Sequence, residues 1–265
     1  MDLRLFRKRI LSIAFWAYFI FIGIVHLIIA VGIMLVTFVF DPDRRLNHLF
    51  SCWWGYHYAK IYPGLDVKTL HRSRIQRGRP YVIVANHTSI ADIVLCFGLF
   101  RQFKWVSKKA NFKLPILGPN MRICKYVPLI RGDGRSVSAM FDRCEYWLRR
   151  DISIMMFPEG TRSKTGELLP FKPGAFSLAR RCGVHVVPVV IHGGHELIAK
   201  HSSTFSADAL TRIEVLEPIA PTDFESDDHL AQGVRQIIQD RLNEDPFSVK
   251  QSSISPELPT TVPQQ

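Results

Sequence analysis

Cysteine is scarce in this sequence, and no two cysteines lie close together. The chain has five of them in 265 residues: Cys52, Cys96, Cys124, Cys144 and Cys182. A disulfide framework or a zinc site requires closely spaced cysteines, so this spacing excludes both. We expect reduced, mostly buried thiols in a cytosolic compartment, and we predict no bound metal ion.

Charge is absent from one long stretch near the N-terminus. Residues 10–40 contain no charged side chain, and His26 is their only strongly polar residue. A helix of this length is about 45 Å long, which exceeds the roughly 30 Å hydrocarbon core and excludes an upright span. The stretch is also too long for a signal peptide. A strongly tilted span, a helix extending past the membrane, and two shorter helices with a break near Gly23 or Gly32 remain possible.

Basic residues flank this stretch on both sides. They are Arg4, Arg7, Lys8 and Arg9 before it and Arg44 and Arg45 after it. The positive-inside rule then favours both ends on the cytoplasmic side of the membrane. We therefore predict that residues 1–49 form a membrane-embedded helical segment, either a hairpin that enters and leaves one leaflet, which this rule favours, or a tilted helix.

The formal net charge of +11 is unevenly distributed along the chain. The formal net charge is +3 for residues 1–59, +15 for residues 60–181 and −7 for residues 182–265. Nucleic acid, an anionic membrane and phosphorylated small substrates are all suitable partners for such a basic middle. The chain lacks a recognisable reading helix or aromatic-stacking signature, so we predict no nucleic-acid binding.

Apolar runs and helical patterns alternate from residue 80 to residue 219. The predicted strands cover residues 81–85, 126–131, 152–157, 184–191 and 211–219, and helices are expected at 136–150, 173–180 and 227–243. This alternation predicts an α/β fold with a mainly parallel central sheet flanked by helices, in a domain of residues 50–245. Its first residues, 50–62, are rich in aromatics and suit either an amphipathic helix on the core or a membrane interface. Residues 246–265 are rich in Ser, Pro, Thr and Gln, and we expect them to be disordered.

A histidine follows the first of these strands at its junction with a helix. His87 lies at the strand-to-helix turn, and Asp92 is close enough in sequence to fold back onto its ring. Such a pair makes a general base. Two alternatives stay open, because Asp92 also suits a capping box with Ser89 and His87 also suits a core position.

A second polar motif follows the strand at residues 152–157. Pro158, Glu159, Gly160, Thr161, Arg162 and Ser163 form a glycine-containing turn with one guanidinium and two hydroxyls. In phosphate-binding sites, backbone N–H groups and a guanidinium converge on one anion, so this turn has the composition of a phosphate-binding site. A charged β-turn without function has the same composition.

Four blocks of the sequence together resemble those of the glycerolipid acyltransferases. In chain order they are residues 86–92 (NHTSIAD), 127–131 (VPLIR), 157–163 (FPEGTRS) and 187–191 (VPVVI). Within that group the chain is similar to the bacterial lysophosphatidic acid acyltransferases. The hydrophobic N-terminus resembles the two-helix membrane motif of those enzymes, which supports the hairpin and implies a catalytic domain on the cytoplasmic side of the inner membrane.

The resemblance also implies roles for individual residues. His87 would be the general base and Asp92 the carboxylate that orients it. The block around Pro188 would help to shape the acyl-donor side of the site. The residues implied to bind the substrate phosphate are Arg131, Glu159, Gly160, Arg162 and, as a weaker transfer, Lys108.

The reaction implied is transfer of a fatty acyl group from a thioester to the sn-2 hydroxyl of 1-acylglycerol-3-phosphate. The product would be phosphatidic acid, and the donor either acyl-CoA or acyl-carrier protein, with no other cofactor. Other acceptors remain open: another lysophospholipid, a lyso-ornithine lipid or glycerol-3-phosphate. An alternative of a different class is a non-catalytic membrane-binding protein that retains the fold.

Overall fold

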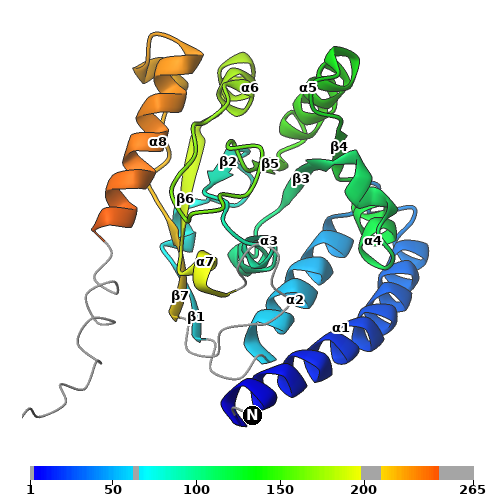
Figure 1. The fold of residues 1–265 in the computed structure, drawn as a ribbon. Helices are drawn as coiled ribbons and strands as arrows, with labels where there is room; N and C mark the ends of the chain where they lie inside the picture. The colour runs from blue at the N-terminus through cyan, green and yellow to red at the C-terminus, as the bar shows by residue number, and fades with distance from the viewer. Residues whose placement is uncertain (1–2, 62–65, 198–209, 245–265) are drawn as a thin grey trace, which may run out of the picture.

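A computed structural model describes residues 3–61, 66–197 and 210–244, which build a central sheet with helices on both faces (Figure 1). Within these ranges seven strands form one sheet. The strands are β1 (Asp66–Leu70), β2 (Val82–Ala85), β3 (Phe103–Lys108), β4 (Val127–Leu129), β5 (Ser153–Met156), β6 (Val186–His192) and β7 (Leu210–Val215).

The sheet is mainly parallel, as the sequence predicts. The strand order is β1-β7-β6-β2-β5-β3-β4. Strand β2 pairs in parallel with β5 and β6, and β3 pairs in parallel with β4 and β5. Strand β7 is antiparallel to β6 and parallel to β1, so the two strands at this end of the sheet, β1 and β7, run against the others. Parallel strands are covered on both faces, which is why a run such as Val82–Ala85 is entirely apolar and buried.

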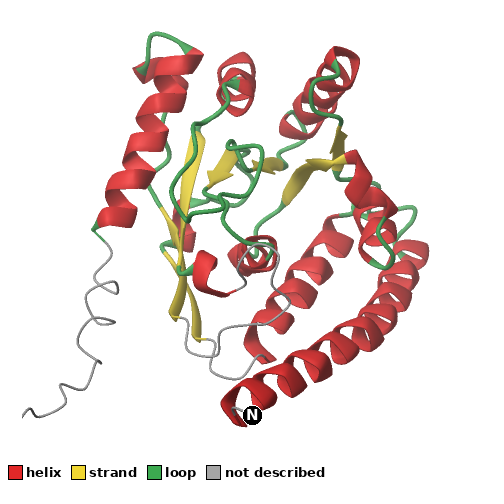
Figure 2. Ribbon diagram, viewed as in Figure 1, coloured by secondary structure: helices red, strands yellow, loops and turns green. Residues whose placement is uncertain are grey.

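Helices lie on both faces of the sheet (Figure 2). They are α1 (Leu3–Val36), α2 (Arg45–Ile61), α3 (Ala91–Cys96), α4 (Leu117–Ile123), α5 (Gly134–Leu148), α6 (Gly174–Cys182), α7 (Gly194–Leu197) and α8 (Asp227–Asn243), with 3-10 turns at η1 (Arg72–Arg74), η2 (Phe97–Leu99), η3 (Lys109–Lys113) and η4 (Pro221–Asp223). Alternate residues of β2 enter two separate cores, because successive strand side chains point to opposite faces. Ile83 packs with α2 and α3, whereas Val84 packs with α5, α6 and α8.

The structure of the N-terminal segment differs from the prediction in the position of the helix break. Helix α1 runs unbroken from Leu3 to Val36, so the break expected near Gly23 or Gly32 is wrong. The hairpin partner is instead α2, which begins at Arg45, and the expected boundary between residues 49 and 50 falls inside it. The chain reverses at Arg44, which has a φ of 60°. The Asp41 carboxylate accepts the backbone N–H groups of Arg45 and Leu46, and these bonds cap α2.

The corner between α1 and α2 is fixed to the sheet by charged side chains. The fully buried Lys104 of β3 donates to the backbone oxygens of Asp43 and Cys124 and stacks over the Trp147 ring. Arg150 holds the Asp43 carboxylate through two hydrogen bonds of 2.9 and 3.0 Å. We did not predict β3 from the sequence, because Lys104, Ser107 and Lys108 interrupt the apolar pattern of this six-residue strand.

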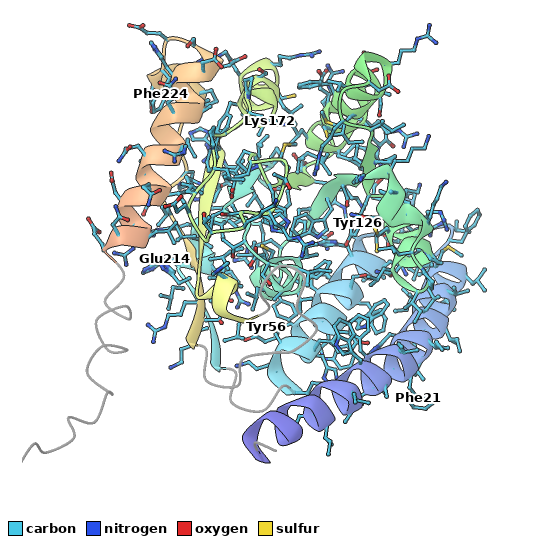
Figure 3. The ribbon with its side chains drawn as sticks, viewed as in Figure 1. Phe21, Tyr56, Tyr126, Lys172, Glu214 and Phe224 are labelled. Carbon is cyan, nitrogen blue, oxygen red and sulfur yellow. The ribbon has the colours of Figure 1, made fainter. Side chains whose placement is uncertain are left out.

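Much of the apolar surface of α1 is exposed. Residues Trp16–Val36 are long and apolar enough to cross a membrane, and only 17% of the most apolar window is buried. Phe21 lies 66% exposed on the side of α1 turned away from the sheet (Figure 3). An exposed apolar surface of this extent marks a membrane or partner contact, and with the composition of α1 it indicates membrane association. The expected disordered tail, residues 246–265, lies outside the described residues.

Candidate active site

His87 and Asp92 meet at the carboxyl end of β2, as the sequence predicts. His87 Nδ1 lies 2.9 Å from Asp92 Oδ2. The same oxygen accepts the backbone N–H groups of Thr88 at 2.7 Å and Ser89 at 2.8 Å. Asp92 is fully buried. The capping and dyad interpretations are therefore both realised by one carboxylate, because the helix start that Asp92 caps also aims it at the imidazole.

The ring of His87 is held in one plane by an aromatic stack. Phe157, which directly follows β5, lies parallel to the imidazole with ring centroids 3.9 Å apart and an interplanar angle of 8°. Trp105 of β3 packs behind Phe157 at 5.3 Å. The stack restrains the tilt of the imidazole plane, and the hydrogen bond to Asp92 restrains rotation of the ring within that plane. A group that transfers a proton requires such a fixed orientation.

The backbone of His87 is held by the third sequence block. Its N–H donates to Glu159 Oε1 at 2.6 Å, and its carbonyl accepts from the Ser163 N–H at 2.9 Å. Glu159 Oε2 accepts the Leu169 N–H. Burial raises the pKa of Glu159 to about 7, against the two hydrogen bonds that favour its ionised form. The Glu159 carboxylate therefore contacts protein backbone, so its geometry favours a positioning role over the phosphate contact expected from the sequence.

The first and fourth blocks are joined by an amide. Asn86 Oδ1 accepts the Ile191 N–H at 2.8 Å, and Asn86 Nδ2 donates to the Ile191 carbonyl at 3.0 Å. The buried Asn86 side chain thus continues the pairing of β2 with β6 beyond Ala85. The block around Pro188 contributes none of the residues that line the cavity described below, and it acts on the site through this link.

Gly194, at the start of α7, packs directly against the dyad. A Cβ placed on Gly194 would lie 3.0 Å from Thr88 Oγ1 and closer still to Asp92 Oδ1. Neither of those two buried atoms has a hydrogen-bond partner among the described residues. The backbone of Gly194 can therefore approach Asp92 only because it carries no side chain. The sequence analysis missed this role, since a glycine after a strand suits an ordinary turn.

His87 and Phe157 line a cavity of about 620 Å³. Three exposed basic residues line it as well: Lys108 at the end of β3, Arg131 after β4 and Lys172 before α6. Among its described lining residues there is no Asp or Glu. Gly160, with a φ of 71°, also lines the cavity, and the position of a Cβ there would be 3.3 Å from Lys172 Nζ. A cationic wall beside a neutral base suits an anionic substrate.

The sequence and the structure differ over which cations reach the cavity. Lys108, Arg131 and Gly160 are brought together as expected. Arg162 is half-buried and is not among the lining residues, so its phosphate contact stays a prediction. Lys172 was missed, although a lysine just before a predicted helix indicates a side chain at the carboxyl edge of the sheet.

The rest of the cavity wall is apolar and comes from helices on both sides. Residues of the N-terminal helices and of the helix after the dyad line one part: Trp16, Phe19, Trp54, Tyr58, Ile93 and Val94. The wall therefore continues from the dyad to α1, whose outer surface is the exposed apolar one. A substrate with a charged head and a long apolar chain fits this combination.

Comparisons with known proteins agree with the geometry. A model of a protein family described as Acyltransferase matches residues 66–192. A 1-acyl-sn-glycerol-3-phosphate acyltransferase of Chlamydomonas reinhardtii is 31% identical over 88% of this chain and 70% of its own length. A chloroplastic 1-acyl-sn-glycerol-3-phosphate acyltransferase of Arabidopsis thaliana is 35% identical over 68% of this chain, which spans about half (51%) of that relative.

A solved structure shares the whole fold. The crystal structure of the 1-acyl-sn-glycerophosphate acyltransferase of Thermotoga maritima superimposes with a TM-score of 0.74 at 27% identity, covering 91% of this chain and 97% of that one. The resemblance found in the four sequence blocks is thereby confirmed. The chain belongs to the acyltransferase family that contains the 1-acyl-sn-glycerol-3-phosphate acyltransferases.

Proposed function

We propose that this protein transfers a fatty acyl group from a thioester donor to the sn-2 hydroxyl of 1-acylglycerol-3-phosphate, giving phosphatidic acid. The observation that carries the proposal is a His87–Asp92 dyad in a cavity that combines three cations with a long apolar wall. The names of the relatives support the same acceptor.

His87 acts as the general base in this reaction. With Nδ1–H donated to Asp92, Nε2 carries the lone pair and takes the proton of the sn-2 hydroxyl as its oxygen attacks the thioester carbonyl. The C–S bond then breaks, and the leaving thiolate takes the proton back from the imidazolium. Asp92 fixes the tautomer and stabilises the imidazolium while it exists. The thioester is already activated, so the step requires no covalent enzyme intermediate.

Two of the three cations hold the acceptor by its phosphate. Lys108 and Arg131 line the cavity with His87, and an anion bound between them is a handle remote from the reacting hydroxyl. Binding of the phosphate at a fixed position places the hydroxyl next to the imidazole. The binding energy thereby orients the reacting atoms and raises the rate of acyl transfer. Acceptors without a phosphate lose this contact, which is the basis for selectivity.

The membrane supplies the acceptor and receives the product. The exposed apolar surface of α1 would lie in one leaflet, with the sheet domain outside it. Basic residues flank the uncharged stretch of residues 10–40 on both sides, which supports a cytoplasmic location for the sheet domain and the inner membrane as its site.

A panel of acceptors tests the proposal. The purified protein in mixed micelles is offered a labelled acyl-CoA with 1-acylglycerol-3-phosphate, glycerol-3-phosphate, a lyso-ornithine lipid or a neutral-headgroup lysophospholipid. We expect the highest kcat/KM for 1-acylglycerol-3-phosphate. A higher value for another acceptor would reassign the substrate. Absence of transfer to every acceptor, from both acyl-CoA and acyl-carrier protein, would favour the non-catalytic alternative.

A further inference from the structure

The cavity at His87 has a second apolar part that the acceptor does not explain. It lies between the N-terminal turns of α5 and α6 and is lined by Val137, Met140, Phe141, Met156, Gly174 and Ala175. Phe141 and Gly174 face each other across it, since a Cβ on Gly174 would meet only the Phe141 ring, at 4.0 Å. We call these six residues the α5–α6 groove.

The groove and the part of the cavity beside α1 belong to opposite faces of the sheet. Met140, Met156 and Ala175 are members of the core formed with α5, α6 and α8. Trp105 and Leu95, which line the other part, belong to the core formed with α2 and α3. Helices α1 and α2 carry the exposed apolar surface, so the lipid acceptor reaches His87 from their face. The α5–α6 groove therefore leads to His87 from the opposite face of the sheet, away from α1 and α2.

The rim of the groove favours an anion. Lys172 stands two residues before Gly174, is exposed and lines the same cavity. Within the described part of the chain, no side chain caps the first turn of α6, whose residues Gly174 and Ala175 both line the cavity. A free helix N-terminus carries a partial positive charge and adds to that of the lysine.

We infer that the α5–α6 groove holds the phosphopantetheine arm of the acyl donor, with its phosphate at Lys172 and its thioester at His87. The inference rests on the proposed function, because an acyl transfer between two large substrates requires two approaches to one base. The arm is a long, thin chain in which aliphatic segments alternate with two amides and a hydroxyl, and it ends in a phosphate. It therefore matches a groove of apolar side chains that opens at a helix N-terminus and has a cationic rim. This arm is common to acyl-CoA and acyl-carrier protein, so the groove accepts either source.

Filling the groove tests the inference. Gly174→Leu places a side chain between α5 and α6 at a residue whose backbone is helical and whose Cβ meets no clash. Gly134→Leu is the matched control, since Gly134 also begins a helix and a Cβ there meets nothing within 4 Å. Lys172→Ala is a second variant at an exposed side chain, which removes the cation without filling the groove. KM is measured for acyl-CoA and acyl-carrier protein separately, for 1-acylglycerol-3-phosphate, and for a short S-acyl-N-acetylcysteamine that lacks most of the arm.

We expect Gly174→Leu to raise the KM of the donor that the wild type uses by about tenfold or more, which is at least ~1.4 kcal/mol of lost binding. Lys172→Ala should raise the same KM, and the KM for 1-acylglycerol-3-phosphate and the kcat/KM of the short thioester should stay at wild-type values in both variants. An unchanged donor KM in Lys172→Ala and Gly174→Leu, or an equal rise for the acceptor, would overturn the groove assignment. A wild-type protein that transfers no acyl group from any donor would overturn the proposed function together with it.

Discussion

Replacing Gly194 with alanine should disable the dyad without touching either of its members. The Cβ of alanine would lie against Asp92 Oδ1 and 3.0 Å from Thr88 Oγ1. Gly194 lies in a helix and has no positive φ, so its backbone accepts alanine without strain of its own. The added methyl group therefore acts through the contact with Asp92.

The expected loss of rate in Gly194→Ala follows from the small space between Gly194 and the Asp92 carboxylate. Ordinary van der Waals contact requires the Asp92 carboxylate to move by about 1 Å. The carboxylate is held by His87 Nδ1 and by the N–H groups of Thr88 and Ser89, at 2.7 to 2.9 Å. A shift of that size takes such bonds out of hydrogen-bond range or turns the imidazole with them. Misplacement of a catalytic group by about 1 Å costs on the order of a hundredfold in rate.

The assay is kcat for acyl transfer at saturating concentrations of both substrates, with thermal unfolding as the check on folding. We expect a folded Gly194→Ala variant with kcat reduced about a hundredfold and KM values near those of the wild type. Gly134→Ala, at an open helix start, should match the wild type in every respect. A Gly194→Ala variant with kcat within twofold of the wild type would refute the reasoning.

Four other substitutions test residues around the dyad and the cavity. Asn86→Ala leaves the backbone N–H and carbonyl of Ile191 without their side-chain partner, and should lower the free energy of unfolding by on the order of 3 kcal/mol in thermal or chemical denaturation. Burial raises the pKa of Glu159 to about 7, so the folded protein holds this proton more tightly than the unfolded chain does. The resulting contribution to the free energy of unfolding is fully present below about pH 4.5 and is lost as the pH rises through 7. Glu159→Gln cannot ionise, so the difference in unfolding free energy, wild type minus variant, should fall by up to about 3 kcal/mol from pH 4.5 to 7.5. Arg131→Ala should raise the KM for 1-acylglycerol-3-phosphate by about tenfold or more, and Arg162→Ala by less, because only Arg131 lines the cavity.

Each of these has an outcome that would contradict it. Asn243→Ala, at an exposed position, is the control for Asn86→Ala, and equal stability of the two variants would exclude a structural role for the amide. A wild-type minus Glu159→Gln difference that is flat with pH would show that Glu159 ionises normally. Arg143→Ala, on the exposed side of α5, is the control for Arg131→Ala, and a larger KM effect of Arg162 would restore the sequence-based assignment.

The sheet and the dyad were predictable because short-range patterns determine them. A buried β-branched run such as Val82–Ala85 has few alternatives to a parallel strand, and the spacing of His87 and Asp92 is local. The same holds for the helix start, where the Asp92 carboxylate accepts the Ser89 N–H as a capping box requires.

The N-terminal hairpin was misplaced because glycine is a weak helix breaker. A glycine in a helix costs about 1 kcal/mol relative to alanine, which is too little to break a long apolar helix. Gly23 serves instead as a contact for Ile116, whose Cγ2 would lie 3.2 Å from a Cβ placed there. The reversal occurs at Arg44, where Asp41 and Asp43 supply the cap and the link to Arg150.

The roles of Glu159 and Gly194 could not be predicted from the sequence because they depend on contacts with distant parts of the chain. Glu159 accepts N–H groups from His87 and Leu169, which lie 72 and 10 residues away in the chain. Gly194 reaches Asp92 only through the register of β6 beside β2. A motif identifies which residues gather at the carboxyl edge of the sheet, and the fold decides whether each faces substrate or backbone.

The central claim is that His87 is the base that deprotonates the acceptor hydroxyl. The most direct test is the rate of phosphatidic acid formation from acyl-CoA or acyl-carrier protein and 1-acylglycerol-3-phosphate by His87→Ala. Its control is His229→Ala, at an exposed position of α8. The account predicts a rate lower by about 10²–10⁴-fold in a folded His87→Ala protein, and a wild-type rate for the control. A wild-type rate of product formation by folded His87→Ala would contradict it.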